Sequence, residues 1–193
     1  EMCIRDRTTT QMASLTTTQV GALASTQIGG LGSAQLASLT TTQIGALTST
    51  QMGAISSAQI KGLETTDIAV LTTTQIGGLN STQLGGLTSA QVVGLSTTGL
   101  AVLTTAQFVG LTGTQLGALS TTQVAAITST SITALTTRQM EGLTTTQLAS
   151  LSTTQITALE STDIAALNET QVAGFTTTQI GTMSSAQVNA LFA

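Results

Sequence analysis

The sequence predicts an all-α solenoid, a superhelical spiral of very short helices with one helix in each eight-residue repeat. Glutamine recurs every eight residues from Gln11 to Gln187, with few interruptions. Large apolar residues fill the fifth and eighth places of the repeat, and Ser or Thr opens most units. These three observations place the signals of a helix start in every unit of a repeat array. A β-solenoid is the alternative, because Thr and Ile favour strands.

The array covers residues 8–191 as 23 units of the type TTTQIGGL (72–79), without insertion or deletion. Residues 1–7, EMCIRDR, break the pattern, so we interpret them as a non-repeat leader left by a vector or sequencing adapter. Residues 192–193 follow the last unit without the polar capping repeat that ends a solenoid, which indicates a truncated end. We therefore expect a fragment of a longer array.

The start of each helix is predicted from residues close together in the chain. In unit 72–79, Thr72 is expected at the N-cap and Gln75 at the third helical position, which is the S/T-x-x-Q capping box. Leu71 and Ile76 then flank the cap as a hydrophobic staple. Gly77 and Gly78 would allow the helix to end before the next unit begins at residue 80.

The period of eight excludes one continuous helix and disfavours strands. Eight residues advance about 800° along an α-helix, so the apolar stripe would wind around a single rod. In a straight strand, the fifth and eighth residues would point to opposite faces. A short helix followed by a bend in each unit satisfies the pattern better than either.

The apolar places define the expected core. The fifth place is always apolar and the eighth is Leu in 19 of 23 units. Burying one Ile and one Leu contributes roughly 3–6 kcal/mol, whereas ordering eight residues costs about 1.5 kcal/mol per residue. Neighbouring units must therefore stack to be stable. Small seventh-place residues would permit that approach, and the sixth place, which accepts Lys61 and Glu141, is expected to face solvent.

The glutamine column is the candidate structural site. Its expected role is helix capping, and the alternative is a polar ladder that binds a ligand. The residues chosen to represent the capping role are Gln11, Gln19, Gln43, Gln75, Gln83, Gln147 and Gln179.

The column is interrupted at four positions that lie 32 residues apart: Asp67, Gly99, Ser131 and Asp163. Either a 32-residue segment was duplicated, or one superhelical turn holds about four units. Glu64 with Asp67 and Glu160 with Asp163 are expected at N-cap and N3, where a carboxylate favours the helix start. The alternative assigns these pairs to catalysis or calcium, but calcium takes six to eight oxygens and no further acids lie nearby in the sequence.

The composition argues against several classes of function. There is no His, so imidazole catalysis and imidazole metal ligation are excluded. Four cationic residues and a net charge of −4 cannot form a nucleic-acid-binding stripe. No apolar run approaches the roughly 18 residues of a membrane span. We expect no catalytic residue, no cofactor and no metal site, and therefore not an enzyme.

Two segments, LTTTQIGALTSTQ (39–51) and LSTTQITALESTDIAAL (151–167), resemble the octapeptide arrays of very large bacterial surface or secreted proteins labelled haem-utilisation or adhesin-like. The resemblance implies an extracellular scaffold. It implies no haem site here, because the chain lacks His and Tyr. We expect a non-catalytic spacer or stalk whose partners are neighbouring repeats, with self-association through open solenoid ends. The alternative function is a binding module that presents Thr and Ser rows to ice or carbohydrate.

Overall fold

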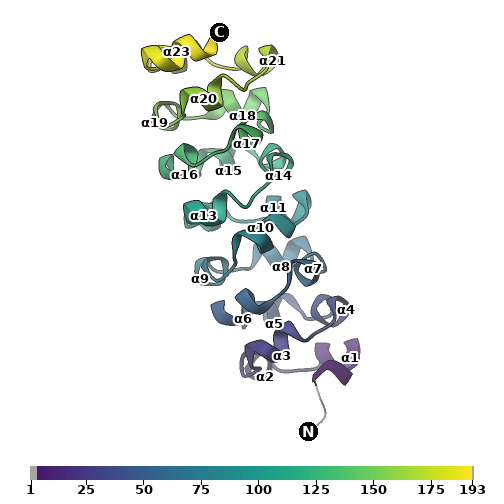
Figure 1. Ribbon diagram of the computed structural model, residues 1–193. Coiled ribbons are helices and arrows are strands. Elements are labelled where there is room, and N and C mark those ends of the chain that lie inside the picture. Colours follow the sequence, from purple (N-terminus) through teal and green to yellow (C-terminus); the bar gives the residue numbers. More distant parts are fainter. Residues whose placement is uncertain (1–3, 193) are drawn as a thin grey trace.

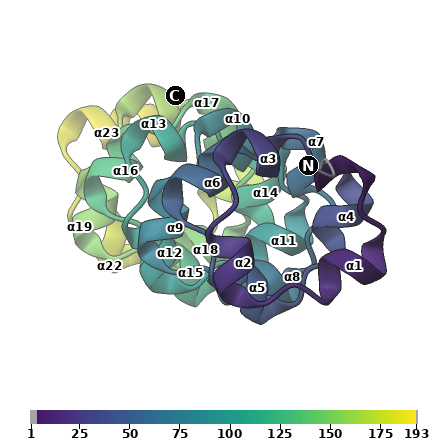
Figure 2. The same ribbon diagram turned by 90° about the horizontal axis from the view of Figure 1, so that it is seen from below.

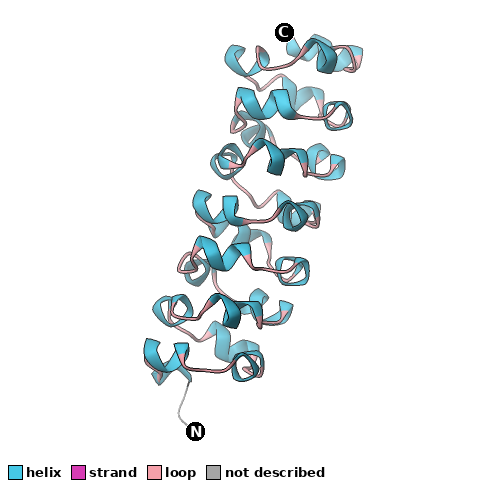
Figure 3. Ribbon diagram, turned by 180° about the vertical axis from the view of Figure 1, so that it is seen from behind, coloured by secondary structure: helices cyan, strands magenta, loops and turns pink. Residues whose placement is uncertain are grey.

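The computed structural model describes residues 4–192, which form an elongated stack of short helices (Figures 1 and 3). The two ends of the chain lie at opposite ends of the stack. No strand occurs within residues 4–192. The predicted helical solenoid is confirmed, and the β-solenoid alternative is wrong.

One helix falls in each eight-residue unit, and the helices are four to seven residues long. A 3-10 turn, η1 (Ile4–Asp6), precedes them. The helices are α1 (Thr9–Ala13), α2 (Thr17–Gly21), α3 (Ser25–Gly29), α4 (Ser33–Ala37), α5 (Thr41–Gly45), α6 (Ser49–Ala54), α7 (Ser57–Ile60), α8 (Thr65–Ala69), α9 (Thr73–Gly77), α10 (Ser81–Gly86), α11 (Ser89–Gly94), α12 (Thr97–Ala101), α13 (Thr105–Phe108), α14 (Gly113–Ala118), α15 (Thr121–Ala125), α16 (Ser129–Thr133), α17 (Thr137–Glu141), α18 (Thr145–Ser150), α19 (Thr153–Thr157), α20 (Ser161–Ile164), α21 (Glu169–Val172), α22 (Thr177–Ile180) and α23 (Ser185–Leu191).

Each helix begins and ends through ordinary backbone conformations. Thr72, at the N-cap of α9, is extended with φ −73° and ψ 160°, and Gly78 closes the helix in the αR region with φ −79°. Where the helix runs one residue longer, as in α10, the eighth-place Leu87 is the extended C-cap. No glycine within residues 4–192 has a positive φ. Glycine is therefore not needed here for a left-handed helix end.

Helices three units apart form the walls of the solenoid. The most extensive contacts join α8 with α11, and extensive contacts also join α3 with α6 and α20 with α23; the same spacing of three holds along the chain. Viewed from below, α2, α5 and α8 accordingly lie close together on one side (Figure 2). A helix thus rests on the turn beneath it and not on its neighbour in sequence.

The two apolar places of each unit form one continuous core along the stack. Fifth-place residues such as Ile76 and Phe108 are completely buried, and eighth-place residues such as Leu79 and Leu111 are 2–3% exposed. Apolar residues of the first and last turns, including Leu15 and Met183, are only partly buried against this cluster. Stacking therefore provides the burial that a single unit lacks.

Small residues let successive turns touch through their backbones. A Cβ atom added to Gly142, in the seventh place, would lie 2.4 Å from the Cα atom of Gly113. The sixth place is more varied than expected. Lys61 and Glu141 are exposed there, but a Cβ atom on Gly117 would lie 2.3 Å from the carbonyl oxygen of Gly142. The sixth place thus faces solvent in some units and the next turn in others.

Candidate functional site: the glutamine ladder

Each glutamine first completes the start of its own helix. In α9, the backbone N–H of Thr72 donates to Oε1 of Gln75 at 2.9 Å, and the N–H of Gln75 donates to the Thr72 hydroxyl at 3.3 Å. The same N-cap N–H to Oε1 bond is present at all seven glutamines chosen from the sequence: Gln11, Gln19, Gln43, Gln75, Gln83, Gln147 and Gln179.

The other end of the glutamine amide bonds to the preceding turn. Nε2 of Gln75 donates to the carbonyl oxygens of Ile44 at 2.9 Å and Leu47 at 2.7 Å, which lie 31 and 28 residues earlier. Gln75 is only 3% exposed. Its two ends therefore join a helix start to the end of a helix in the fourth preceding unit. Gln75 therefore does more than cap its helix, because its Nε2 also bonds to the preceding turn. Its amide is bonded to protein at both ends, so a ladder that binds an external ligand does not describe it either.

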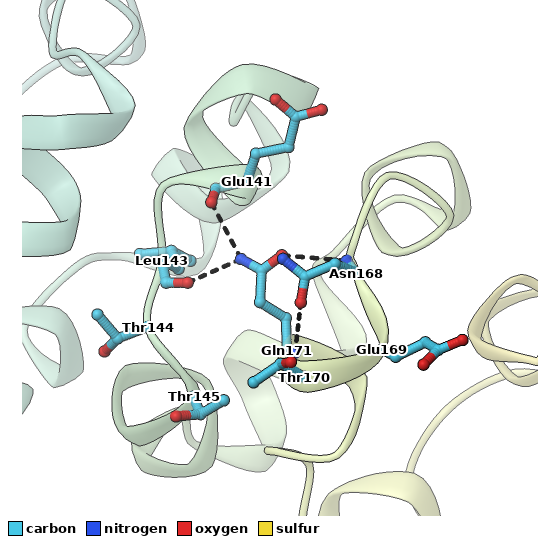
Figure 4. Close-up of a pocket in the computed structure, with 8 residues that line it drawn as sticks. All are labelled: Glu141, Leu143, Thr144, Thr145, Asn168, Glu169, Thr170 and Gln171. Carbon is cyan, nitrogen blue, oxygen red and sulfur yellow. Dashed lines mark hydrogen bonds between the residues drawn. The ribbon is translucent and has the colours of Figure 1, made fainter.

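We call the connection that one glutamine makes between two turns a joint. Figure 4 shows the joint at Gln171. Its Nε2 donates to the carbonyls of Glu141 at 3.1 Å and Leu143 at 2.7 Å, while its Oε1 accepts from the N–H of Asn168 at 3.1 Å. The Asn168 side chain accepts from the N–H of Gln171 at 2.9 Å. One buried side chain thus satisfies backbone groups from two turns.

We call this set of bonds the glutamine ladder. Each member donates to the carbonyl 28 residues earlier. Its members are Gln35, Gln43, Gln51, Gln59, Gln75, Gln83, Gln91, Gln107, Gln115, Gln123, Gln139, Gln147, Gln155, Gln171, Gln179 and Gln187. Because a joint connects units four apart, the ladder consists of four interleaved series.

The four interruptions fall in one of those series. Asp67, Gly99, Ser131 and Asp163 are 32 residues apart, so each stands four units from the next. All four are buried, and none supplies the amide donor. The Ser131 hydroxyl bonds to Thr128 at 3.1 Å, within its own unit. After Gln35, which does bond to the preceding turn, the next four joints of this series therefore lack the inter-turn hydrogen bond that the other series make.

Glu64 and Glu160 stand at the N-caps of α8 and α20, with Asp67 and Asp163 at the third helical position, as predicted. Neither Glu64 nor Glu160 makes a side-chain cap hydrogen bond. The N–H groups of Asp67 and Asp163 donate instead to the backbone carbonyls of Glu64 at 3.0 Å and Glu160 at 3.1 Å. The predicted N-cap positions are confirmed, but the glutamate side chains are exposed to solvent and the backbone carbonyl accepts the hydrogen bond in their place.

The two aspartates differ from each other. Oδ2 of Asp67 accepts from the N–H of Glu64 at 2.9 Å, as a glutamine would. Oδ2 of Asp163 is buried and has no hydrogen-bond partner. Burial raises the pKa of both carboxyl groups; the bond from Glu64 opposes the rise at Asp67, and the charge of Glu160 adds to the rise at Asp163.

The surface carries shallow features between the turns. The pocket in Figure 4 has a volume of about 700 Å³ and is lined by Glu141, Leu143, Thr145, Asn168 and Glu169 among others. Within residues 4–192, no three His, Cys, Asp or Glu side chains gather in a way that could hold a metal ion. In the same part of the chain, no helix is both long and apolar enough to cross a membrane.

Comparison with known families identifies the repeat. The family model described as the ALTTAQ repeat matches residues 30–63, 60–97, 132–169 and 156–192, which is more than half of the chain. The chain belongs to the ALTTAQ repeat family. Each ALTTAQ match spans between four and five eight-residue units, so it includes two units that one ladder joint connects. No curated protein matches the sequence.

Proposed function

We propose that this ALTTAQ array is a non-catalytic structural scaffold, a spacer or stalk within a larger bacterial surface or secreted protein. The observation that supports this function best is the glutamine ladder. Its joints use side-chain amides and backbone carbonyls that recur in every turn. Units can therefore be added without a change in the cross-section of the stack.

The test is the dependence of length on the number of units. Variants with one or two additional copies of residues 72–103, four units each, would be measured by small-angle X-ray scattering. A spacer lengthens by a constant increment per copy at constant cross-sectional radius. A compact or irregular particle would refute the proposal.

The proposed location is extracellular or at the cell surface. Its support is the resemblance of segments such as 151–167 to arrays of large bacterial surface and secreted proteins, together with a surface rich in uncharged Thr and Ser. Antibody labelling of intact producing cells tests it. Labelling only after permeabilisation would contradict the location but not the spacer role.

Self-association is part of the proposal. One side of a turn offers amide donors, as at Gln75, and the opposite side offers carbonyl acceptors, as at Leu47. Turns of separate chains are thus complementary in the same way as turns of one chain. Sedimentation velocity over a range of concentrations tests this, and a monomer throughout would remove self-association from the proposal.

A second candidate is a carbohydrate-binding module. A surface pocket of about 670 Å³ is lined by hydroxyls from α13, α16 and α19, at Thr105, Ser129, Thr130, Thr133, Thr154 and Thr157. First-place hydroxyls are used for capping, as at Thr136, so these second-, third- and sixth-place groups would carry the interaction. Glycan-array binding that is lost in Thr130→Val would favour this candidate over the spacer.

A further inference from the structure

At Asp163, an aspartate stands where the neighbouring units have a ladder glutamine. In the next unit, Gln171 places its Nε2 3.2 Å from the carbonyl oxygen of Met140 and 2.7 Å from that of Leu143. One unit earlier in the repeat, the corresponding carbonyls belong to Ile132 and Leu135, and the corresponding side chain is Asp163. Aspartate is one methylene shorter than glutamine and, when ionised, only accepts hydrogen bonds.

The Asp163 carboxylate is itself left without a partner. Its side chain is 3% exposed, and Oδ2 makes no hydrogen bond. Asp67 shows that this is not a general property of the substitution, because its Oδ2 accepts from Glu64. A buried, unpaired carboxylate is costly, and proteins balance such charges with a partner cation or a metal. A positively charged ligand beside Asp163 would therefore stabilise the folded chain.

The size and charge of that ligand follow from the neighbouring joint. The Nε2 group of Gln171 lies 2.7–3.2 Å from its carbonyl oxygens, whereas calcium requires six to eight oxygens at about 2.3–2.6 Å. A single positive charge neutralises the single carboxylate. We propose that Asp163, with the carbonyls of Ile132 and Leu135, binds a monovalent cation of potassium or ammonium size in the position of the missing amide.

The test is thermal unfolding followed by the helical circular dichroism signal. Potassium chloride would replace choline chloride at constant ionic strength and pH 7. We expect the midpoint of the wild-type chain to rise by about 2–4 °C and to saturate with potassium concentration. Asp163→Gln should not respond, because it supplies its own amide as at Gln155 and Gln171.

The matched control is Asp67→Gln, which changes the same residue type at another joint of the same series. This variant should retain the potassium response, because the proposed site at Asp163 is unchanged. Asp67 itself is not expected to bind the cation, since its carboxylate already has a backbone partner. A wild-type chain without a saturable response overturns the site, as does an unchanged response in Asp163→Gln. A larger rise with calcium chloride at equal ionic strength would overturn the monovalent assignment.

Discussion

At the scale of the residue, the repeat depends on glutamine because one amide both accepts and donates. Oε1 of Gln91 accepts from the N–H of Thr88 at 2.8 Å, and its Nε2 donates to the carbonyls of Ile60 at 2.9 Å and Leu63 at 2.6 Å. A glutamate would direct a second acceptor at those carbonyls, and an asparagine is too short to span the turn. This explains why the fourth place tolerates so few other residues.

Replacing a buried ladder glutamine should cost more than replacing one that only caps. Gln91→Ala is expected to lower the free energy of unfolding by about 1–3 kcal/mol, because it leaves buried carbonyls without their donor. Gln19→Ala is the control, since Gln19 is exposed and bonds through Oε1 to Thr16; its cost should stay near 1 kcal/mol or below, as for other caps. Urea titration measures both. Equal losses would contradict the structural role of the inter-turn bonds.

The buried aspartates should make stability depend on pH. The pKa values of Asp67 and Asp163 are raised above the usual 3.8 in the folded chain, so the folded state holds protons that the unfolded state has released. Stability therefore falls as pH rises from about 3.8 through the raised pKa values, and acidification from neutrality restores it.

In potassium-free buffer, we expect the thermal midpoint of the wild-type chain to increase as pH falls from 7 towards 4. The double variant Asp67→Gln with Asp163→Gln should lose most of this slope. Glu64 and Glu160, and Arg138 and Glu141 on the helix α17 that packs against α20, remain in both proteins. An equal slope in the two proteins would show that other groups control the pH dependence.

At the scale of the element, local contacts could be predicted from the sequence and contacts between turns could not. Thr72 and Gln75 lie three residues apart, so their capping box follows from helix geometry alone. The bond from Gln75 to Ile44 spans 31 residues and depends on how many units complete a turn, which no local pattern states. At Glu64 and Glu160 the N-cap positions could likewise be predicted, but the hydrogen-bond acceptor could not, because the backbone carbonyl competes with a long side chain for the same N–H group.

The role of each glycine at a helix end also cannot be predicted from the sequence alone. Gly142 and Gly77 both close helices in the sequence pattern, but only Gly142 touches another turn. Gly142→Ala is expected to destabilise the chain by about 1–3 kcal/mol, because its Cβ would overlap the backbone of Gly113.

Gly77→Ala is the matched variant. Apart from its chain neighbours and its own helix backbone, no heavy atom lies within 4 Å of its added Cβ. A helical alanine has less conformational entropy to lose on folding, so a gain of about 0.4–1 kcal/mol is expected. Both variants would be compared by chemical denaturation. Similar effects of the same sign would mean that the backbone contact at Gly142 does not limit packing.

At the scale of the whole molecule, one superhelical turn holds between three and four units. Helices pack three units apart, whereas each ladder glutamine reaches the end of the fourth preceding helix. The 32-residue spacing of Asp67, Gly99, Ser131 and Asp163 therefore matches the spacing of the joints. This geometry is compatible with duplication of a four-unit segment, since such a copy would keep each interruption within the same series.

Register, and not composition, should decide whether the stack tolerates deletions. Removing residues 72–79 deletes one complete unit, so every downstream glutamine still meets a carbonyl pair 28 and 31 residues earlier. Removing residues 72–75 deletes half a unit, so for about one turn the downstream glutamines lie opposite first- and fourth-place residues, as Gln83 would opposite Thr48 and Gln51, and no longer opposite the fifth- and eighth-place carbonyls. Circular dichroism should show nearly unchanged helicity per residue for the first variant, and lower helicity with a reduced thermal midpoint for the second. Equal behaviour of the two would mean that the helices form independently of the ladder, which their length of four to seven residues argues against.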